Sequence, residues 1–156
     1  MDRLEAVRQV VDEILHEQPD LEEHRCGFVH LYGVSATCAL LALKRGQDVE
    51  LCAVAGMLHD VWTYKSGDPA DHARLSAREA EQILGELGCF GPDEIAAVCG
   101  AIARHSAKAE QDGAMDELLK DADVLQHFLY NPTLPVQEGE QDRLTQILEE
   151  LTVKEA

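Results

Sequence analysis

Apolar residues recur at intervals of three and four along almost the whole chain, and this spacing restricts the fold more than any other feature of the sequence. In the first segment Leu4, Val7 and Val11 lie on one helical face, and Ile14 and Leu15 continue it. Alternation with a period of two, which is typical of half-buried strands, is nearly absent, and aromatic residues make up only 4% of the chain. The sequence therefore predicts an all-α protein.

Six to seven helices follow from this spacing and from the glycine, proline and aspartate residues that interrupt it. The segment 61–71 contains Gly67, Asp68 and Pro69 and is predicted to form a loop. The 49–59 helix contains the run LCAVAGML and is so apolar that we expect burial on most sides. The first three helices are expected at about 2–17, 22–45 and 49–59. A fourth runs from Ala70 or Ser76 to Leu87, and a fifth begins at Pro92. A sixth ends at about Asn131, and the last covers 140–153.

The length of 156 residues corresponds to about one domain. Hydrophobic residues make up 46% and charged residues 28% of the chain, which is ordinary for a globular protein and argues against disorder. A globule of this size buries roughly 68–70% of its unfolded surface, so it needs no disulfide or metal merely to stay folded. We expect one compact single-domain helical bundle spanning residues 1–156.

The net charge of the chain is strongly negative. Thirteen Lys and Arg stand against thirty Asp and Glu, which gives a formal charge of −17. This sign disfavours duplex nucleic acid or an anionic membrane surface as the main partner, because both would repel the protein. A small anionic substrate remains compatible if a cation lies in its pocket.

The five cysteines form no C-x-x-C pair, which indicates reduced thiols rather than a disulfide framework or a cysteine zinc site. The segment 1–18 is amphipathic and acidic and does not have the pattern of a signal peptide. No uninterrupted apolar run approaches the ~18 residues of a membrane span. We therefore expect a cytoplasmic protein without membrane association, and the first and last amphipathic helices leave a homo-oligomer open.

Several histidines and aspartates lie where their apolar neighbours predict burial. His30 lies on the apolar stripe of its helix, and the pair His59-Asp60 ends the most apolar helix. His105 continues another apolar face, and Asp123 lies in the apolar segment LLKDADVLQ. Because a buried, unpaired carboxylate costs several kcal/mol, converging His and Asp side chains would satisfy one another through a divalent cation. For any single histidine, the alternative is an ordinary hydrogen-bonded core residue.

Other motifs are set aside. His16, His24 and His127 have no matching partners and are expected outside the site, on the surface or as local caps. Glu13 and His16 form an E-x-x-H motif, but a di-iron bundle needs a second copy of it. Neither a G-x-S-x-G elbow nor a phosphate-binding glycine loop is present.

The order of the buried polar residues resembles the HD-domain metal-dependent phosphohydrolase superfamily. His30 is followed by the His-Asp doublet of AVAGMLHDVW, and IARHS and LLKDADVLQ come next in the expected order. The resemblance covers roughly residues 24–130. It implies an HD-type helical domain in which 1–18 and 140–153 are flanking helices.

The resemblance also implies one or two divalent ions, drawn from Fe, Mn, Co, Ni, Zn and Mg. In two-metal branches of the superfamily one aspartate, here Asp60, bridges both ions. Asp121 is expected to have a structural role or to contact a ligand. The ligands of the first ion would be His30, His59, Asp60 and Asp123, and those of the second Asp60, His72 and His105.

The implied chemistry is attack by water or hydroxide on a divalent metal at a phosphate ester or anhydride of a small nucleotide-like substrate. Asp60 would act as the catalytic residue that orients or deprotonates the water. Lys65, Arg104 and Lys108, together with Arg74, lie near the expected ligands in the sequence and are predicted to contact phosphate. The arrangement is similar to the branch that cleaves diadenosine tetraphosphate symmetrically, whereas the insertions of cyclic-nucleotide phosphodiesterases are missing.

Two other functions fit the same residues. HD folds that hold a mixed-valence di-iron centre can activate dioxygen, so an oxygenase is one alternative. The other is a non-catalytic module that binds a nucleotide or a protein partner. The presence of every expected ligand position argues against the second, because binding alone has no chemical need for all of them.

Overall fold

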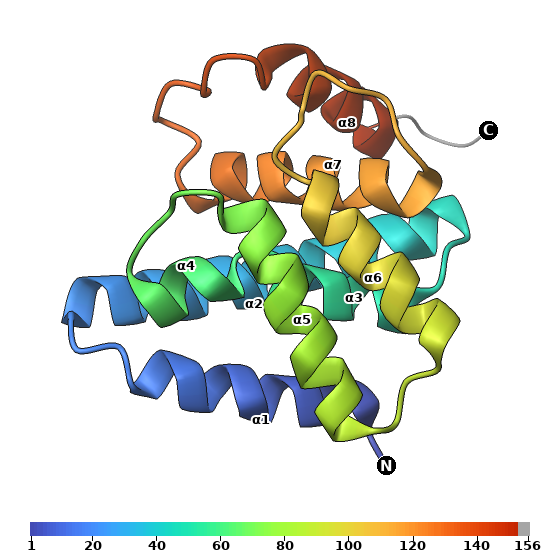
Figure 1. Cartoon of the computed structure of the whole chain (residues 1–156). Coiled ribbons are helices and arrows are strands. Elements are labelled where there is room, and N and C mark those ends of the chain that lie inside the picture. The colour runs from blue at the N-terminus through green and yellow to red at the C-terminus, as the bar shows by residue number, and fades with distance from the viewer. Residues whose placement is uncertain (153–156) are drawn as a thin grey trace.

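Eight helices and no strand are found in residues 1–152, the part of the chain that the computed structural model describes (Figure 1). This confirms the predicted all-α class. The predicted helix 140–153 corresponds to the last of them, and residue 153 lies outside the described residues. The helices are α1 (Arg3–His16), α2 (Leu21–Arg45), α3 (Val49–Leu58), α4 (Val61–Ser66), α5 (His72–Leu87), α6 (Pro92–Arg104), α7 (Ala114–Tyr130) and α8 (Gln141–Thr152).

Aspartate side chains begin the first three helices. Asp2 and Asp48 each accept a hydrogen bond from the backbone N–H three residues later, at 3.0 and 2.9 Å, and Asp20 caps α2 in the same way. These bonds satisfy backbone donors that have no partner within the helix. At the other end of α2, Gly46 adopts the left-handed conformation (φ 65°) and stops the helix.

A short helix, α4, replaces the first half of the predicted 61–71 loop, so that prediction is wrong for residues 61–66. Two interactions with the rest of the molecule support α4. Val61 is fully buried in the core, and the N–H of Trp62 donates to the Oγ of Ser76, at 3.1 Å. The turn residues from Gly67 onward therefore end a helix, and Ser76 lies inside α5 rather than at its start.

Helix α3 lies at the centre of the bundle. It packs against α1, α2, α5, α6 and α7, and every residue from Cys52 to Leu58 is buried, as its composition predicts. Gly56 allows α3 to approach α2 closely, because a Cβ atom there would lie 2.7 Å from the Cα of Ser35. The carboxyl end of α3 is therefore held in the interior, beside α2.

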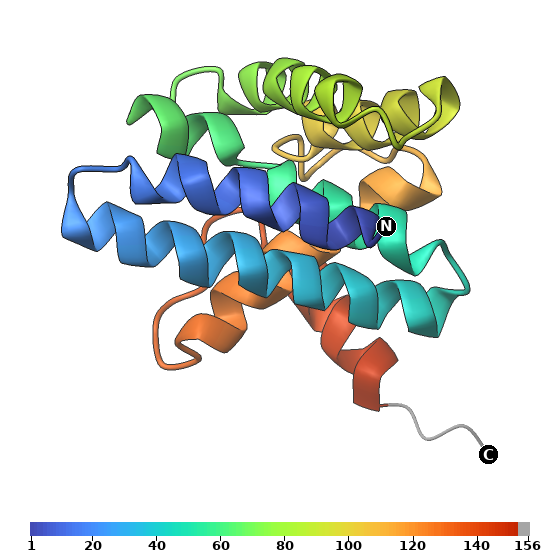
Figure 2. The ribbon, with the colours of Figure 1, turned by 90° about the horizontal axis from the view of Figure 1, so that it is seen from below.

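The remaining helices surround α3 (Figures 1 and 2). Helix α1 runs alongside α2 in the opposite direction, α5 and α6 form a pair on one side, and α7 and α8 lie on another. Helix α7 packs against α2, α3 and α6. Side chains from α2, α6, α7 and the end of α3 can therefore meet inside the bundle.

Helix α2 is the one helix in the described part of the chain whose length and composition would allow it to cross a membrane. Within its most apolar window, 44% of the residues are buried inside the molecule. The helix packs against α3 and α7, and core helices of soluble proteins have the same length and composition.

Candidate metal centre

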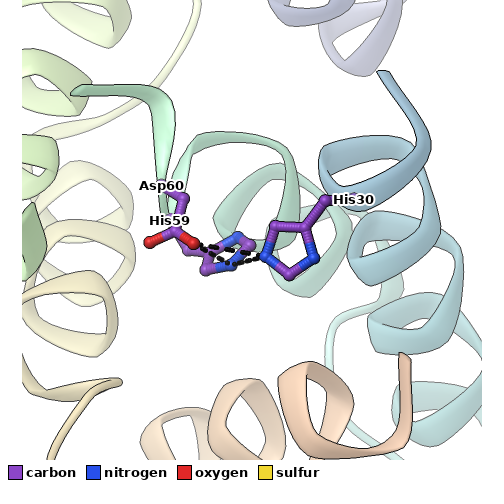
Figure 3. Close-up of side chains that lie close together, drawn as sticks. All are labelled: His30, His59 and Asp60. Atoms are coloured by element: carbon purple, nitrogen blue, oxygen red, sulfur yellow. Dashed lines mark hydrogen bonds and ion pairs between the residues drawn. The ribbon is translucent and has the colours of Figure 1, made fainter. Parts of the chain in front are cut away.

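Three of the predicted ligands meet between α2 and the end of α3 (Figure 3). His30 projects from α2, His59 ends α3, and Asp60 follows directly. The Nε2 of His30 lies 3.0 Å from the Nε2 of His59 and 3.2 Å from the Oδ2 of Asp60. The Nε2 of His59 lies 3.3 Å from the same oxygen. Two imidazole nitrogens and one carboxylate oxygen therefore face a common point.

Asp123 of α7 adds a second carboxylate to this group. Its Oδ1 lies 3.5 Å from the Nε2 of His30 and 3.5 Å from the Nε2 of His59. Asp123 and His59 are both buried, and His30 and Asp60 are largely covered. The structure thus brings together the four residues predicted for the first ion. Their role as metal ligands remains a prediction.

His72 and His105 face the other oxygen of Asp60. The Nε2 of His105 lies 3.2 Å, and the Nε2 of His72 3.6 Å, from the Oδ1 of Asp60. The centres of the two rings are 5.1 Å apart. Asp60 therefore directs Oδ2 toward one pair of imidazoles and Oδ1 toward another, and a carboxylate placed in this way can bridge two ions.

A repeated local hydrogen bond orients three of these imidazoles. In His59, His72 and His105 the Nδ1 atom bonds to the carbonyl oxygen three residues earlier, at 2.8, 3.1 and 2.7 Å. His30 uses a distant partner, since its Nδ1 lies 2.8 Å from the Oε1 of Gln126. Because an oxygen acceptor faces each Nδ1, this nitrogen carries the proton, and Nε2 presents its lone pair to the carboxylates.

The cluster formed by these six ligand candidates has acceptors facing acceptors at its centre. The Oδ1 atoms of Asp60 and Asp123 are buried and have no hydrogen-bond partner in the described part of the protein. Burial of unpaired polar atoms is costly, and a cation among them would remove that cost. Within each of three overlapping three-residue groups of these candidates, the candidate ligand atoms lie within 4.8 Å of one another. The residues therefore fit a divalent metal, and their N and O donors suit Fe, Mn, Co, Ni or Zn.

The electrostatic surroundings keep both carboxylates ionised. Burial alone would raise the pKa of Asp60, but the imidazoles of His59 and His105 hold it well below its ordinary value. Burial is likewise outweighed at Asp123, where His59 and Lys108 hold the pKa well below its ordinary value. Burial disfavours protonation of His59, yet the charges of Asp60 and Asp123 raise its pKa to about 10, so a metal that binds its Nε2 displaces a proton. At His105 burial prevails and lowers the pKa. The centre thus offers two ionised carboxylates to a cation.

Two cavities, of about 380 and 550 Å³, adjoin the cluster, and Lys108 lines the larger one. The Nζ of Lys108 donates to the Oδ2 of Asp123 at 2.6 Å and to the carbonyl oxygen of His105 at 2.8 Å. The structure therefore brings this predicted phosphate-binding lysine to the cluster.

The other predicted phosphate contacts lie elsewhere. Lys65 pairs with Glu79, Arg104 pairs with Asp116 at 2.6 Å, and Arg74 pairs with Asp71. None of the three cations lines either of the two cavities. Arg104 precedes His105 in the sequence, but successive helical side chains point about 100° apart, so adjacency does not bring both to the same place. The prediction that Lys65 and Arg104 contact substrate has no support from their positions.

His127 was expected outside the site, and this expectation is wrong. Its ring stacks on that of His30, with centres 5.3 Å apart and an interplanar angle of 11°. Its Nε2 lies 3.5 Å from the Oδ1 of Asp123, and its Nδ1 lies 3.5 Å from Glu140. The spacing of four between Asp123 and His127, which places both on one face of α7, was the available signal. In contrast, His16 and His24 pack against Phe28.

Comparison with known proteins gives two matches in agreement with this geometry. The sequence model of the HD domain family matches residues 27–127, about two thirds of the chain. The chain is also similar to the crystal structure of a predicted HD superfamily hydrolase from an uncultured Thermotogales bacterium. The two are 21% identical over 92% of this chain and 88% of that one, with a TM-score of 0.61, a likeness that concerns the fold. A comparison with curated proteins found no match.

Proposed function

Because the chain belongs to the HD domain family, we propose that it is a metal-dependent phosphohydrolase that acts on a phosphate ester or anhydride of a small, nucleotide-like substrate. One observation carries the proposal. Asp60 directs one oxygen toward His30 and His59 and the other toward His72 and His105. Paired ions that share a ligand are a recurrent solution for phosphoryl transfer. The relative of similar fold is described as a predicted hydrolase, which supports the same reading.

In this proposal two divalent ions share Asp60. When bound, such ions neutralise phosphoryl oxygens and lower the pKa of a coordinated water from about 16 to about 7. Their charge matters here because the chain's own charge of −17 opposes an anionic substrate. His30, His59, Asp60 and Asp123 would hold the first ion, and Asp60, His72 and His105 would hold the second.

The side chains of the protein position water and substrate. Asp60, held ionised by the imidazoles around it, accepts a hydrogen bond from the attacking water and orients it toward phosphorus. The ammonium group of Lys108 has three N–H donors, of which two go to Asp123 and to the carbonyl of His105. The third remains to be donated to a phosphoryl oxygen in the adjoining cavity.

Metal analysis followed by phosphatase assays tests this function. We expect the protein loaded with Mn, Co, Ni or Mg to hydrolyse p-nitrophenyl phosphate. His59→Ala and Asp60→Ala should lose both the retained metal and the turnover. His16→Ala is the matched control, because His16 packs against His24 and Phe28 instead of the cluster. Full metal content in either cluster variant would show that the ligand assignment is wrong.

The second ion has a separate test. We expect wild type to bind two ions and His72→Ala or His105→Ala to bind one, because each variant removes an imidazole that faces the Oδ1 of Asp60. A wild-type stoichiometry near one that neither variant changes would reject the two-ion form of the proposal.

The same preparations distinguish the two alternative functions. Turnover that requires iron and dioxygen, together with an optical signature of a di-iron cluster, would indicate an oxygenase. Retained metal without any turnover would indicate a binding module.

We also propose that the protein acts in the cytoplasm on a small molecule rather than on nucleic acid. The five cysteines are free thiols in the structure, which suits a reducing compartment. The charge of −17 disfavours nucleic acid as a partner.

A further inference from the structure

The smaller cavity beside the cluster has mostly apolar walls. It measures about 380 Å³, a size that accommodates a small organic group, and it reaches His30 and Asp60 at one end. Its walls come from α2, α4, α7, α8 and the 131–140 segment. The apolar side chains that form them include Val29, Tyr64, Phe128, Val136 and Leu144.

No lysine or arginine within residues 1–152 lines this cavity. Its histidine and carboxylate residues are His30, Asp60 and His127, which belong to the cluster or contact it, and Glu140, which is 6% exposed. A phosphate placed among the apolar walls would lose its hydration and would find no lysine or arginine, while the imidazole of His127 already faces Glu140. The cavity therefore suits an uncharged, largely apolar group.

The larger cavity, of about 550 Å³, is polar. Among the described residues, Lys108 is the one lysine or arginine that lines this cavity, whereas Glu110, Glu138 and Glu140 line it with carboxylates. A chain of several phosphates would meet more negative than positive charge there, but one phosphoryl group beside the cluster and Lys108 would not. Asp60 lines both cavities, so a substrate that extends from one to the other passes the cluster.

We propose, building on the phosphohydrolase function above but replacing its nucleotide-like group, that the substrate carries a single phosphoryl group on an uncharged, predominantly apolar organic group seated in the smaller cavity. In the reaction the oxygen of water bonds to phosphorus, the ester P–O bond breaks, and the leaving oxygen takes up a proton. The products are inorganic phosphate and an apolar alcohol. Nucleoside polyphosphates are disfavoured as substrates by the charges of both cavities.

Two esters with equally basic leaving groups test the proposal, namely 2-phenylethyl phosphate and ethyl phosphate. We expect kcat/KM of the metal-loaded wild type to be higher by about tenfold or more for the phenylethyl ester, because its ring leaves water for the cavity. ATP should be a poorer substrate than the phenylethyl ester. The phosphonates of the same two groups, titrated by calorimetry, should show the same preference in Kd without any turnover.

A pair of variants on α2 connects this preference to the cavity. Val29→Trp places a large side chain at the cavity wall and should remove most of the preference. The ratio of kcat/KM for the phenylethyl ester to kcat/KM for the ethyl ester should fall by about tenfold. Leu40→Trp is the matched control. Leu40 lies about three turns later on the same face of α2 and is 50% exposed, comparable to 42% for Val29, but it does not line the cavity. It should leave the ratio unchanged.

The outcomes separate this inference from the proposed function. Equal kcat/KM and Kd values for the two groups, faster turnover of ATP, or a loss of preference in Leu40→Trp equal to that in Val29→Trp would overturn the inference while hydrolysis itself stands. If the loaded wild type hydrolyses no ester, the proposed function fails. A phosphonate preference that Val29→Trp removes would then still assign the cavity to an apolar ligand.

Discussion

Asp121 and Asp123 lie two positions apart on α7 and are both buried, yet their surroundings differ in kind. Asp121 is enclosed by two arginines, since its Oδ2 accepts from Arg45 at 2.6 Å and its Oδ1 from Arg143 at 2.7 Å. Asp123 has one oxygen paired with Lys108, whereas the other faces imidazole nitrogens and receives no hydrogen bond within residues 1–152.

Lys120 on the same helix follows the pattern of Asp121. It is fully buried, and its ammonium group donates to Asp112 at 2.7 Å, to Glu117 at 3.2 Å and to the carbonyl of Glu110 at 2.9 Å. All three of its donors are used. The chain thus neutralises these buried charges with its own side chains.

This difference distinguishes buried charges that stabilise the fold from buried charges that are placed to bind a ligand. Asp121 and Asp123 carry the same charge and are both buried, so neither property identifies a site. Completeness of the hydrogen bonding does, because a charge that the chain satisfies stabilises the fold, whereas facing acceptors need a proton or a metal ion from outside. Variants on either side of this comparison should therefore fail in opposite ways.

The largest effect is expected for Asp123→Asn. The amide keeps the shape of the carboxylate but loses its charge, so metal affinity and turnover should fall by at least about 100-fold. Metal content and kcat report this loss. In metal-free buffer the variant should lose less stability toward urea than Asp121→Asn, since Asp123 has one lysine partner where Asp121 has two arginines. A variant that retains its full metal content would contradict the comparison.

Asp121→Asn should do the reverse. It weakens two charge-assisted hydrogen bonds and leaves Arg45 with Glu150 and Arg143 with Glu117, and we expect the free energy of unfolding to fall by about 2 kcal/mol. Urea titration measures this change. Metal stoichiometry of the folded fraction should stay at the wild-type value, and its loss would mean that Asp121 also serves the metal centre.

Removal of the metal sharpens the contrast. A ligand that binds only the folded state at a hundred times its Kd stabilises it by about 2.7 kcal/mol. Chelation should therefore lower the unfolding free energy of wild type and of Asp121→Asn by the same amount. Asp123→Asn should show almost no change on chelation. An equal decrease in all three proteins would place the stabilising ion away from Asp123.

The smallest effect is expected for Gln126→Leu, which removes the acceptor at the Nδ1 of His30. Without it the imidazole is free to rotate or to change tautomer, and metal affinity should fall by about 10- to 100-fold. Competition with a chelator of known affinity measures the change. Gln126→Glu keeps an acceptor at this place and should restore most of the affinity. Equal affinities for the leucine and glutamate variants would show that the hydrogen bond has no orienting role.

Most of the fold could be predicted because helical periodicity is a local property. The spacing of apolar residues placed the helices within a few residues, and the apolar composition of α3 indicated its central position. The error at 61–66 has a tertiary cause. Val61 gains burial, and the N–H of Trp62 finds Ser76, fourteen residues away, as its acceptor. Turn residues nearby could not reveal either interaction.

The candidate site was predicted in part for a similar reason. Polar residues on apolar helix faces marked His30, His59 and His105, and the superfamily resemblance selected Asp123 over Asp121. The place of His127 beside the cluster was not predicted, because it depends on stacking against His30, which lies on another helix. Three of the four cations assigned near the ligands by sequence proximity instead pair with acidic residues, namely Lys65 with Glu79, Arg74 with Asp71 and Arg104 with Asp116.

The sequence by itself determined an all-helical chain with imidazoles and carboxylates on buried faces, because the order of the residues fixes both the periodicity and the side-chain chemistry. Only the tertiary structure decided which of those groups face one another with unpaired acceptors and which find an arginine or lysine. That distinction depends on distances of a few ångströms between helices far apart in the chain, to which local patterns are insensitive.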